Sequence, residues 1–274
     1  MNISDQALPA GQRVALSVEY DGSEFHGWQR QASGQISVQE TLENALSSVA
    51  NAEVRVACAG RTDAGVHATN QIVSFESPVA RSPKAWVMGG NASLPPQVRV
   101  NWARGVAADF HARFSAVSRT YRYVWATQTI RSTTLYRKTT WSRHDLDVDA
   151  MQRSVACLIG EHDFSAFRAA SCQSNSPHRR VDEITFLRRG SFVVMQVTAN
   201  AFLHHMVRNL AGSIGMVGRH LKPEAWIEEL LEGRNRTLAA DTAPPDGLYL
   251  VDVGYPADYN LPNQTKGPIF LCLD

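Results

Sequence analysis

Cysteines are few in this sequence and follow no pattern that forms disulfides or binds zinc. The four cysteines, Cys58, Cys157, Cys172 and Cys272, are widely spaced, and none belongs to a Cys-x-x-Cys pair. This usage is typical of proteins from a reducing cytoplasm. We therefore expect a cytoplasmic protein that has neither a disulfide framework nor a zinc site.

Long apolar runs are also missing. No stretch approaches the ~18–20 apolar residues that span a bilayer, so the sequence predicts no membrane helix. Residues 1–11 are polar and acidic, unlike the basic and apolar start of a signal peptide. We expect residues 1–12 to form a flexible N-terminal tail.

Acidic residues are scarce in one long segment. Residues 97–144 contain nine basic residues and one acid, Asp109, so they carry +8 in a chain whose net charge is +1. Eight of the nine are arginines, which suit planar recognition of phosphates. A basic segment interleaved with aromatic residues is typical of nucleic-acid-binding surfaces, whereas a solvated charged face is the simpler alternative. The aromatic and histidine residues concerned are Phe110, His111, Phe114, Tyr121, Tyr123, Trp125 and Tyr136.

Strand and helix patterns occur twice in the same order. Apolar–polar alternation predicts the strands, and a capping-box sequence at Ser37 predicts the first helix. The predicted β-α-β-β-α-β elements of the first half lie at 13–20, 38–49, 53–58, 71–76, 82–91 and 98–106. Those of the second half lie at 119–127, 147–159, 183–187, 192–198, 201–219 with a short helix at 223–231, and 248–253.

This repetition predicts an α+β fold made of two fused halves of the ferredoxin or RNP type. We expect a mixed, largely antiparallel sheet with helices on one face and a central cleft where the halves join. The expected parts are the tail at 1–12, an N-terminal half at 13–112 and a C-terminal half at 113–274.

One short loop carries several chemically active side chains. Residues 58–68 place Arg61, Asp63 and His67 between two predicted strands, and Gly60 and Gly65 allow tight turns there. Catalytic side chains are often found on loops that are anchored at both ends. Asp63 is therefore a candidate catalytic carboxylate, and a solvated turn is the simpler alternative.

Two other motifs favour structural interpretations. The motif Gly212-x-x-Gly215-x-x-Gly218 lies within a predicted helix and does not follow a strand, so it predicts close helix packing instead of a dinucleotide-binding loop. The motif Asp145-x-Asp147-x-Asp149 lacks the glycine and the bidentate acid of a calcium loop. It predicts the start of a helix, with Asp147 or Asp149 as the cap.

Arg208 lies among apolar residues of a predicted helix. An arginine in such surroundings needs a partner, because an unpaired buried charge is costly. Asp63 is the candidate partner, and an arginine that reaches the surface is the alternative. The nearby His204 and His205 do not predict a metal site, since adjacent residues on a helix point in different directions.

Several segments together resemble the tRNA pseudouridine synthases of the TruA type. Residues 60–67 are similar to the signature loop of that family, and the resemblance extends over residues 13–255. The other similar blocks follow in a fixed order at 20–29, 110–114, 119–123 and 202–209. No departure occurs at the positions that carry the resemblance.

The resemblance implies an isomerase that converts uridine to pseudouridine at positions 38, 39 and 40 of the tRNA anticodon arm. It also implies a homodimer that binds tRNA, base flipping of the target and no cofactor. Asp63 matches the catalytic aspartate, Tyr121 the active-site tyrosine, and Arg208 the basic partner of the aspartate. Arg61 matches the arginine that helps to extrude the base. The remaining matches to RNA-contacting positions are Arg81, Phe110, His111, Ala112, Arg113, Phe114, Ser171, Cys172, Gln173, Ser174 and Asn175.

The chemistry explains why these groups are useful. The isomerisation breaks and remakes one bond to the sugar without oxidation or hydrolysis, so one ionised carboxylate is enough to act as a nucleophile or to stabilise charge. Attack on the base and attack on the sugar both remain open. Two other classes of protein compete with this interpretation. One is a non-catalytic RNA-binding protein, and the other is a metal-dependent phosphodiesterase, which would need a cluster of metal ligands that the sequence does not show.

Overall fold

The computed structural model describes residues 3–32, 34–264 and 267–271. Its internal contacts divide the chain into two units, Met1–Val117 with Leu250–Asp274, and Ser118–Tyr249. The division expected from the sequence instead places the boundary at 112 and the C-terminal residues in the second half. The chain returns to the first unit after Leu250, and there Tyr255 donates a hydrogen bond to the carbonyl oxygen of Ala112 (2.6 Å).

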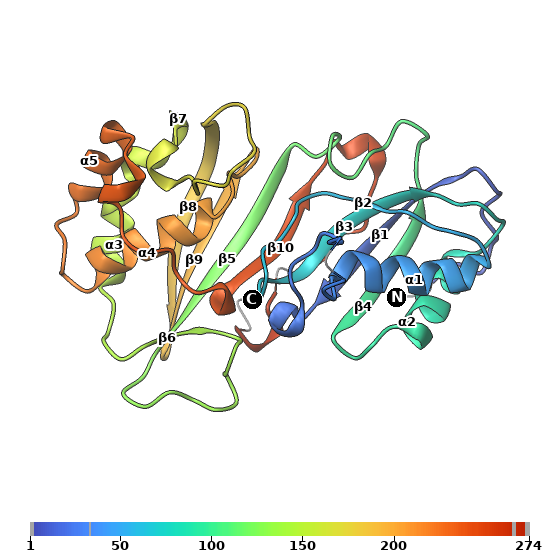
Figure 1. Cartoon of the computed structure of the whole chain (residues 1–274), viewed down its shortest axis with the longest axis horizontal. Helices are drawn as coiled ribbons and strands as arrows, with labels where there is room; N and C mark the ends of the chain where they lie inside the picture. The colour runs from blue at the N-terminus through green and yellow to red at the C-terminus, as the bar shows by residue number, and fades with distance from the viewer. Residues whose placement is uncertain (1–2, 33, 265–266, 272–274) are drawn as a thin grey trace. The chain divides into compact units, whose positions relative to one another are not determined.

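The first unit has the predicted β-α-β-β-α-β order (Figure 1). β1 pairs antiparallel with β3 and β4, and β2 pairs antiparallel with β3. The strand order is β4-β1-β3-β10, and a π-helical turn, Ala85–Gly89, leads into α2. The elements are β1 (Arg13–Tyr20), α1 (Val38–Ala50), β2 (Ala57–Cys58), β3 (His67–Glu76), α2 (Gly90–Ser93), β4 (Val98–Gly105) and β10 (Leu248–Gly254).

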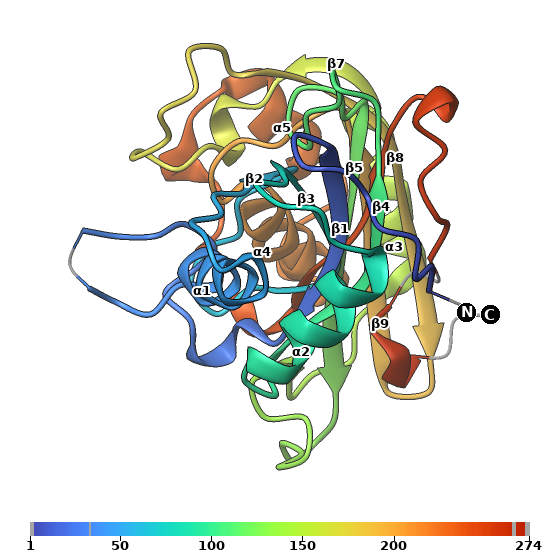
Figure 2. The same cartoon turned by 90° about the vertical axis from the view of Figure 1, so that its right-hand side faces the viewer.

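Local sequence signals account for β1 and α1. The alternating apolar residues around Leu16 in β1 are buried; on the other face Ala15 and Ser17 are buried as well, and Glu19 is exposed. Ser37 caps α1 by accepting a hydrogen bond from the amide of Glu40 (3.3 Å), as the capping box predicts. Figure 2 shows α1 and α2 on the same side of β1 and β4, so both helices cover one face of this sheet.

The second unit adds two strands that the sequence did not predict, β6 and β7. β5, β9, β8 and β7 follow one another as an antiparallel sheet, and β6 pairs parallel with β5, which makes this sheet mixed. α4 begins at Met206, five residues later than predicted, because His205 has a left-handed backbone (φ 61°). The elements are β5 (Ser118–Thr127), β6 (Thr140–Ser142), α3 (Val148–Ser154), β7 (Gly160–Asp163), β8 (His178–Arg189), β9 (Phe192–Ala199), α4 (Met206–Gly218) and α5 (Trp226–Gly233).

The glycines of α4 confirm the prediction of close packing at two of their three positions. A β-carbon on Gly212 would overlap the carbonyl oxygen of Asp241, and one on Gly218 would lie 2.6 Å from the sulfur of Met151 in α3. Gly215 is different, because a β-carbon there would meet only Trp125, at an ordinary 3.9 Å.

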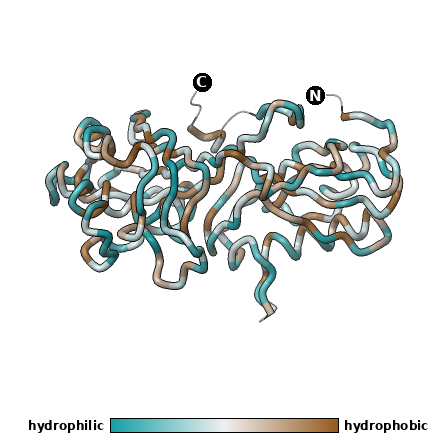
Figure 3. Tube along the Cα trace, turned by 90° about the horizontal axis from the view of Figure 1, so that it is seen from above, coloured by the Kyte–Doolittle hydropathy of each residue, from teal (hydrophilic) through white to brown (hydrophobic). Residues whose placement is uncertain are grey.

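The described part of the N-terminal segment, residues 3–12, makes contacts with the rest of the first unit, whereas the sequence predicts a flexible tail there. Leu8 and Arg81 exchange two backbone hydrogen bonds (2.9 and 3.1 Å), and Asp5 forms an ion pair with Lys84 (3.0 Å). Met1 and Asn2 lie outside the described residues, as does Cys272. Within the described ranges no helix has the length and apolarity to cross a bilayer, and polar and apolar stretches alternate along the trace (Figure 3).

Candidate active site

Asp63 lies in the loop between β2 and β3 of the first unit. The loop is tied at its start, where the amide of Ala59 donates to the carbonyl oxygen of Ile72 (2.8 Å), and near its end, where the amide of Gly65 donates to the carbonyl oxygen of Phe25 (3.3 Å). The side chain of Asp63 is half-buried, whereas that of Arg61 is exposed. The predicted loop anchored between two strands is thus present, and its carboxylate is partly shielded from solvent.

Tyr121 lies on β5 of the second unit and is almost fully buried. Its ring and that of Phe202 pack in a T-shaped arrangement, with 5.0 Å between ring centroids and 82° between planes. This contact holds the ring in one orientation. Phe202 comes from the segment just before α4, so the predicted blocks at 119–123 and 202–209 meet in space.

Arg208 lies in the first turn of α4 and is half-buried. Its Nε donates to the carbonyl oxygen of Ala243 (2.8 Å), and the Ala243 amide donates back to the carbonyl oxygen of Arg208 (3.2 Å). Burial raises the pKa of the Tyr123 hydroxyl, which lies close enough to Arg208 for the guanidinium charge to oppose that shift in part. The pairing of Arg208 with Asp63 would join different units and stays a prediction.

The predicted RNA-contacting block at 110–114 is only partly accessible. Phe110 and Ala112 are buried, with exposed fractions of 1% and 0%, and their assignment as RNA contacts stays a prediction. Phe110 packs against Tyr255 and Tyr259. The accessible part is an exposed turn in which Phe114 is 76% exposed.

This turn presents a stacked group of side chains. The His111 ring lies 4.4 Å from the ring of Phe114, and the guanidinium of Arg113 lies over the same ring at 5.5 Å. Nδ1 of His111 accepts hydrogen bonds from the amides of Arg113 and Phe114 (3.1 and 3.3 Å), which fixes the turn. An exposed aromatic ring beside a cation is suited to stacking on a nucleobase.

The second predicted RNA-contacting segment, residues 171–175, is an irregular loop held by Arg168. Nη2 of Arg168 donates to the carbonyl oxygens of Cys172 and Ser174 (both 2.8 Å). Burial raises the pKa of the Cys172 thiol, but amide hydrogen bonds from Ser174 and His204 and the charge of Arg168 outweigh it, so this pKa lies below its ordinary value. In the same loop Ser171, Gln173 and Asn175 are exposed.

Arg81, the last predicted RNA contact, also has a structural role. Its Nε donates to the carbonyl oxygen of Val49 near the end of α1 (3.1 Å), and its Nη1 donates to the carbonyl oxygen of Ala80 (2.9 Å). A cation at the C-terminal end of a helix is favourable because it complements the helix dipole. The side chain is half-buried, so part of the guanidinium remains accessible.

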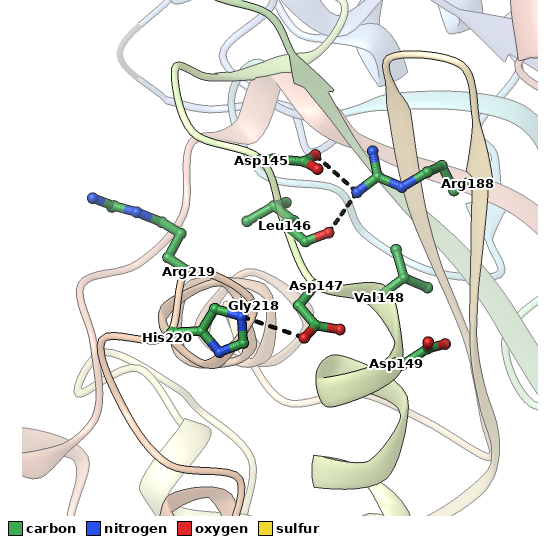
Figure 4. Close-up of a pocket in the computed structure, with 9 residues that line it drawn as sticks. All are labelled: Asp145, Leu146, Asp147, Val148, Asp149, Arg188, Gly218, Arg219 and His220. Carbon is green, nitrogen blue, oxygen red and sulfur yellow. Dashed lines mark hydrogen bonds and ion pairs between the residues drawn. The ribbon is translucent and has the colours of Figure 1, made fainter.

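A pocket of about 590 Å³ lies in the second unit, away from the predicted catalytic residues of that unit (Figure 4). Two of its three acidic residues form ion pairs: Asp145 pairs with Arg188 (2.8 Å), and Asp147 pairs with His220 (3.3 Å). Asp147 also caps α3 by accepting from the amide of Ala150 (2.9 Å). This confirms the prediction that the aspartate motif starts a helix.

Comparison with known proteins identifies the family. The model of the family described as tRNA pseudouridine synthase matches residues 16–115 and 155–256. The chain is 51% identical, over 269 residues, to tRNA pseudouridine synthase A of Escherichia coli O9:H4 strain HS and of Escherichia coli strain ATCC 8739, covering 98% of this chain and 99% of each relative. The chain belongs to the tRNA pseudouridine synthases. This is a family of isomerases, as the resemblance of the motifs implied.

One solved structure, a Cbf5–Nop10–Gar1 complex, also aligns with the synthase. The alignment covers 87% of this chain and 49% of the other at 13% identity, with a TM-score of 0.36. A similarity this low supports no conclusion about fold or function.

Sequence reasoning missed some residues that shape the synthase's predicted sites. Arg168 and Arg179 brace the 171–175 loop, and Nη2 of Arg179 donates to Oγ of Ser174 (2.7 Å). Both lie beyond residue 144, the end of the strongly basic segment. Basic residues on both sides of a predicted RNA-contacting loop would have been the signal.

Proposed function

We propose that this synthase isomerises uridine to pseudouridine at positions 38, 39 and 40 in the anticodon arm of tRNA, with Asp63 as the reacting carboxylate. The proposal includes a cytoplasmic homodimer that binds tRNA and needs no cofactor. The observation that carries it is the position of Asp63, half-buried in a loop that is hydrogen-bonded at both ends, in a chain that belongs to this family.

The reaction is an isomerisation, so substrate and product have the same composition, although the hydrogen on C5 exchanges with solvent. The N1–C1′ bond breaks, the uracil turns, and C1′ bonds to C5; the proton leaves C5, and N1 gains one. A carboxylate that stays ionised in a partly shielded site can act as the nucleophile or stabilise positive charge on the sugar. Asp63 takes this role. No electron acceptor or water is consumed.

Arg208 and Tyr121 assist Asp63 in this proposal. A guanidinium beside the carboxylate offsets the cost of burying its charge. The Tyr121 ring, oriented by its edge contact with Phe202, stacks on the flipped base, an interaction worth ~1–3 kcal/mol. Its hydroxyl group assists removal of the proton from C5.

The target base must leave the helical stack before it can react, which costs a few kcal/mol. Arg61, exposed and two residues before Asp63, fills the space that the base leaves. The turn at 111–114, the loop at 171–175 and Arg81 then position the RNA through stacking and phosphate contacts. Such contacts orient the RNA without reading its sequence, which suits an enzyme that modifies neighbouring uridines in different tRNAs.

The test uses tRNA transcripts labelled with tritium at C5 of uridine, since formation of pseudouridine releases that label. Transcripts in which the uridines at 38, 39 and 40 are replaced by cytidine, singly and together, report the position. We expect tritium release from each transcript that keeps a uridine at position 38, 39 or 40. We expect no release from the transcript in which all three are replaced. Undiminished release from the combined replacement would refute the assigned positions.

Asp63→Asn tests the role of the carboxylate. We expect this variant to bind tRNA with wild-type affinity but to release no label, because the amide cannot act as a nucleophile. Asp109→Asn is the matched control, since Asp109 is an exposed acid in the basic segment. Turnover by Asp63→Asn would contradict the proposal. The proposed dimer is tested separately by light scattering of the 30.2 kDa chain, alone and with tRNA.

A further inference from the structure

The start of the Asp63 loop is held by a buried amide side chain. Gln71 on β3 is fully buried, and its amide group bonds to both backbone groups of Gly60. Nε2 of Gln71 donates to the Gly60 carbonyl oxygen (2.5 Å), and Oε1 accepts from the Gly60 amide (3.3 Å). The side chain therefore continues the pairing of β2 and β3 by one residue into the loop.

The middle of the loop is held by a buried tyrosine. Tyr20, at the end of β1, is 2% exposed, and its hydroxyl lies 2.8 Å from the hydroxyl of Thr62, the residue before Asp63. Gln71 Nε2 is also within 3.5 Å of the Tyr20 hydroxyl. The three side chains form a buried polar chain that holds the side chain of Thr62, next to Asp63.

A backbone segment from 25 to 28 supports the same loop from another side. The amide of Trp28 donates to the carbonyl oxygen of Thr62 (3.0 Å), and the amide of Gly65 donates to the carbonyl oxygen of Phe25 (3.3 Å). Gly27 has φ +87°, and a β-carbon there would lie 2.8 Å from the Thr62 carbonyl oxygen and 3.2 Å from the carbonyl carbon of Asp63. The two chain segments are in direct backbone contact, with no room for a side chain.

We propose that Tyr20, Gln71 and Gly27 are positioning residues for the isomerisation: they hold the loop in the conformation that presents the Asp63 carboxylate. The inference rests on the proposed function, in which Asp63 reacts. None of the three touches the RNA in this assignment. Their effect reaches the reaction through the backbone of residues 60–65.

The geometry leaves the loop little freedom of its own. The peptide groups on both sides of Asp63 are fixed, one through Thr62 and the other through the bond from the Val66 amide. A carboxylate that must approach one atom of a flipped nucleotide is sensitive to small errors, since a displacement of about 1 Å can cost ~100-fold in rate. In the proposed function most RNA contacts lie outside this loop, and Arg61 is the contact assigned within it, so we expect a disturbed loop to affect kcat more than KM.

Tyr20→Phe tests the polar chain by removing one hydroxyl and keeping the ring. In tritium-release kinetics we expect kcat to fall by about 10- to 100-fold, with KM for tRNA within about twofold of the wild-type value. Tyr249→Phe is the matched control, because Tyr249 is also buried and donates from its hydroxyl to a backbone carbonyl, that of Lys138 (2.6 Å). A kcat for Tyr20→Phe equal to that of the control, or a loss confined to KM, would overturn the proposal.

Gly27→Ala tests the backbone contact, and Gly11→Ala controls for backbone strain. Gly11 has a similar φ of +80°, but a β-carbon there would meet nothing within 4 Å. We expect a loss of kcat only in Gly27→Ala, beyond any shared loss of thermal stability. Equal kcat in the two variants would refute the role of Gly27.

A second measurement separates this inference from the proposed function. Hydrogen exchange of the peptide that covers residues 60–66 reports loop order without any turnover. Faster exchange in Tyr20→Phe than in the wild type and in Tyr249→Phe supports the positioning role. If the wild-type protein released no label from tRNA, that result would refute the proposed function but not the hold on the loop that hydrogen exchange reports. Equal exchange in all three proteins refutes the positioning role.

Discussion

Asn209 offers a strong test of how the second unit is held together. It is fully buried in α4, next to Arg208. Its Nδ2 donates to the carbonyl oxygen of Phe167 (2.8 Å), and its Oδ1 accepts from Thr242 Oγ1 (2.6 Å) and Arg236 Nη2 (3.1 Å). One side chain therefore links α4 to two segments that are distant in the sequence, and Asn209→Ala removes all three bonds.

The three lost bonds are not equally costly. Thr242 and Arg236 are only half-buried and also bond to each other (3.1 Å), so they keep partners. The carbonyl oxygen of Phe167 loses the bond from Asn209, and a buried polar group without a partner costs about 1–3 kcal/mol. The loss of the bonds from Thr242 and Arg236 costs less but adds to this. In total we expect Asn209→Ala to lower the free energy of unfolding by about 2–4 kcal/mol.

Urea unfolding followed by the fluorescence of the six tryptophans measures this change. The matched control is Asn235→Ala: Asn235 also accepts two hydrogen bonds, both from Thr237, but it is exposed. We expect the control to cost about 1 kcal/mol or less. If Asn209→Ala costs no more than Asn235→Ala, burial of the Phe167 carbonyl does not have the energetic weight assigned to it here.

Three further changes test other parts of the structure. Asp147→Ala removes a helix cap worth about 0.5–2 kcal/mol. The pKa of Asp147 is lowered in the folded protein by its hydrogen bond from the Ala150 amide. We therefore expect the variant to have a lower Tm than wild type at neutral pH, and this difference to shrink as the pH falls through the lowered folded-state pKa. Gly215→Ala should stabilise α4 by about 0.5–1 kcal/mol in urea unfolding, and Gly212→Ala should destabilise it, because only the latter β-carbon meets a backbone oxygen. Iodoacetamide should modify Cys172 faster than Cys157 by roughly an order of magnitude near pH 7.5, measured as a time course by mass spectrometry. The reason is that the pKa of the Cys172 thiol is lowered, whereas burial raises the pKa of the Cys157 thiol. Equal rates would contradict this.

Elements with strong local signals could be predicted from the sequence. β1 starts and ends at the predicted residues, because its alternation of apolar and polar residues is regular and a turn sequence follows Tyr20. α1 begins after Ser37, as its capping box predicts. The aspartate motif starts a helix as predicted, because capping depends on neighbouring residues, and close packing is confirmed at Gly212 and Gly218 but not at Gly215.

Elements that depend on distant residues could not be predicted. The apolar periodicity before α4 continues back to Ala201, but the helix starts at Met206. The preceding residues are held by other parts of the chain: the His204 carbonyl oxygen accepts from the Ala169 amide (3.1 Å), and the His204 amide donates to the Cys172 sulfur (3.4 Å). No helix signal in the sequence reports such contacts.

In the candidate site, too, the sequence predicts which residues take part but not how they are buried and oriented. Local motifs name Asp63, Tyr121 and Arg208, but burial and orientation come from contacts across long sequence distances. Phe110 is buried by Tyr255 and Tyr259, almost 150 residues later in the chain, so its accessibility could not be read from its own block.

The blocks that carry the family resemblance are partners in tertiary contacts. Residues 20–29 and 60–67 look like separate motifs in the sequence, yet Tyr20 bonds to Thr62, and the backbone at Gly27 lies against Asp63. The blocks at 119–123 and 202–209 meet in the same way through Tyr121 and Phe202. A substitution in one block therefore acts on the other through contact. For this reason the motif at 20–29, which has no catalytic group in the proposed mechanism, can still control the rate.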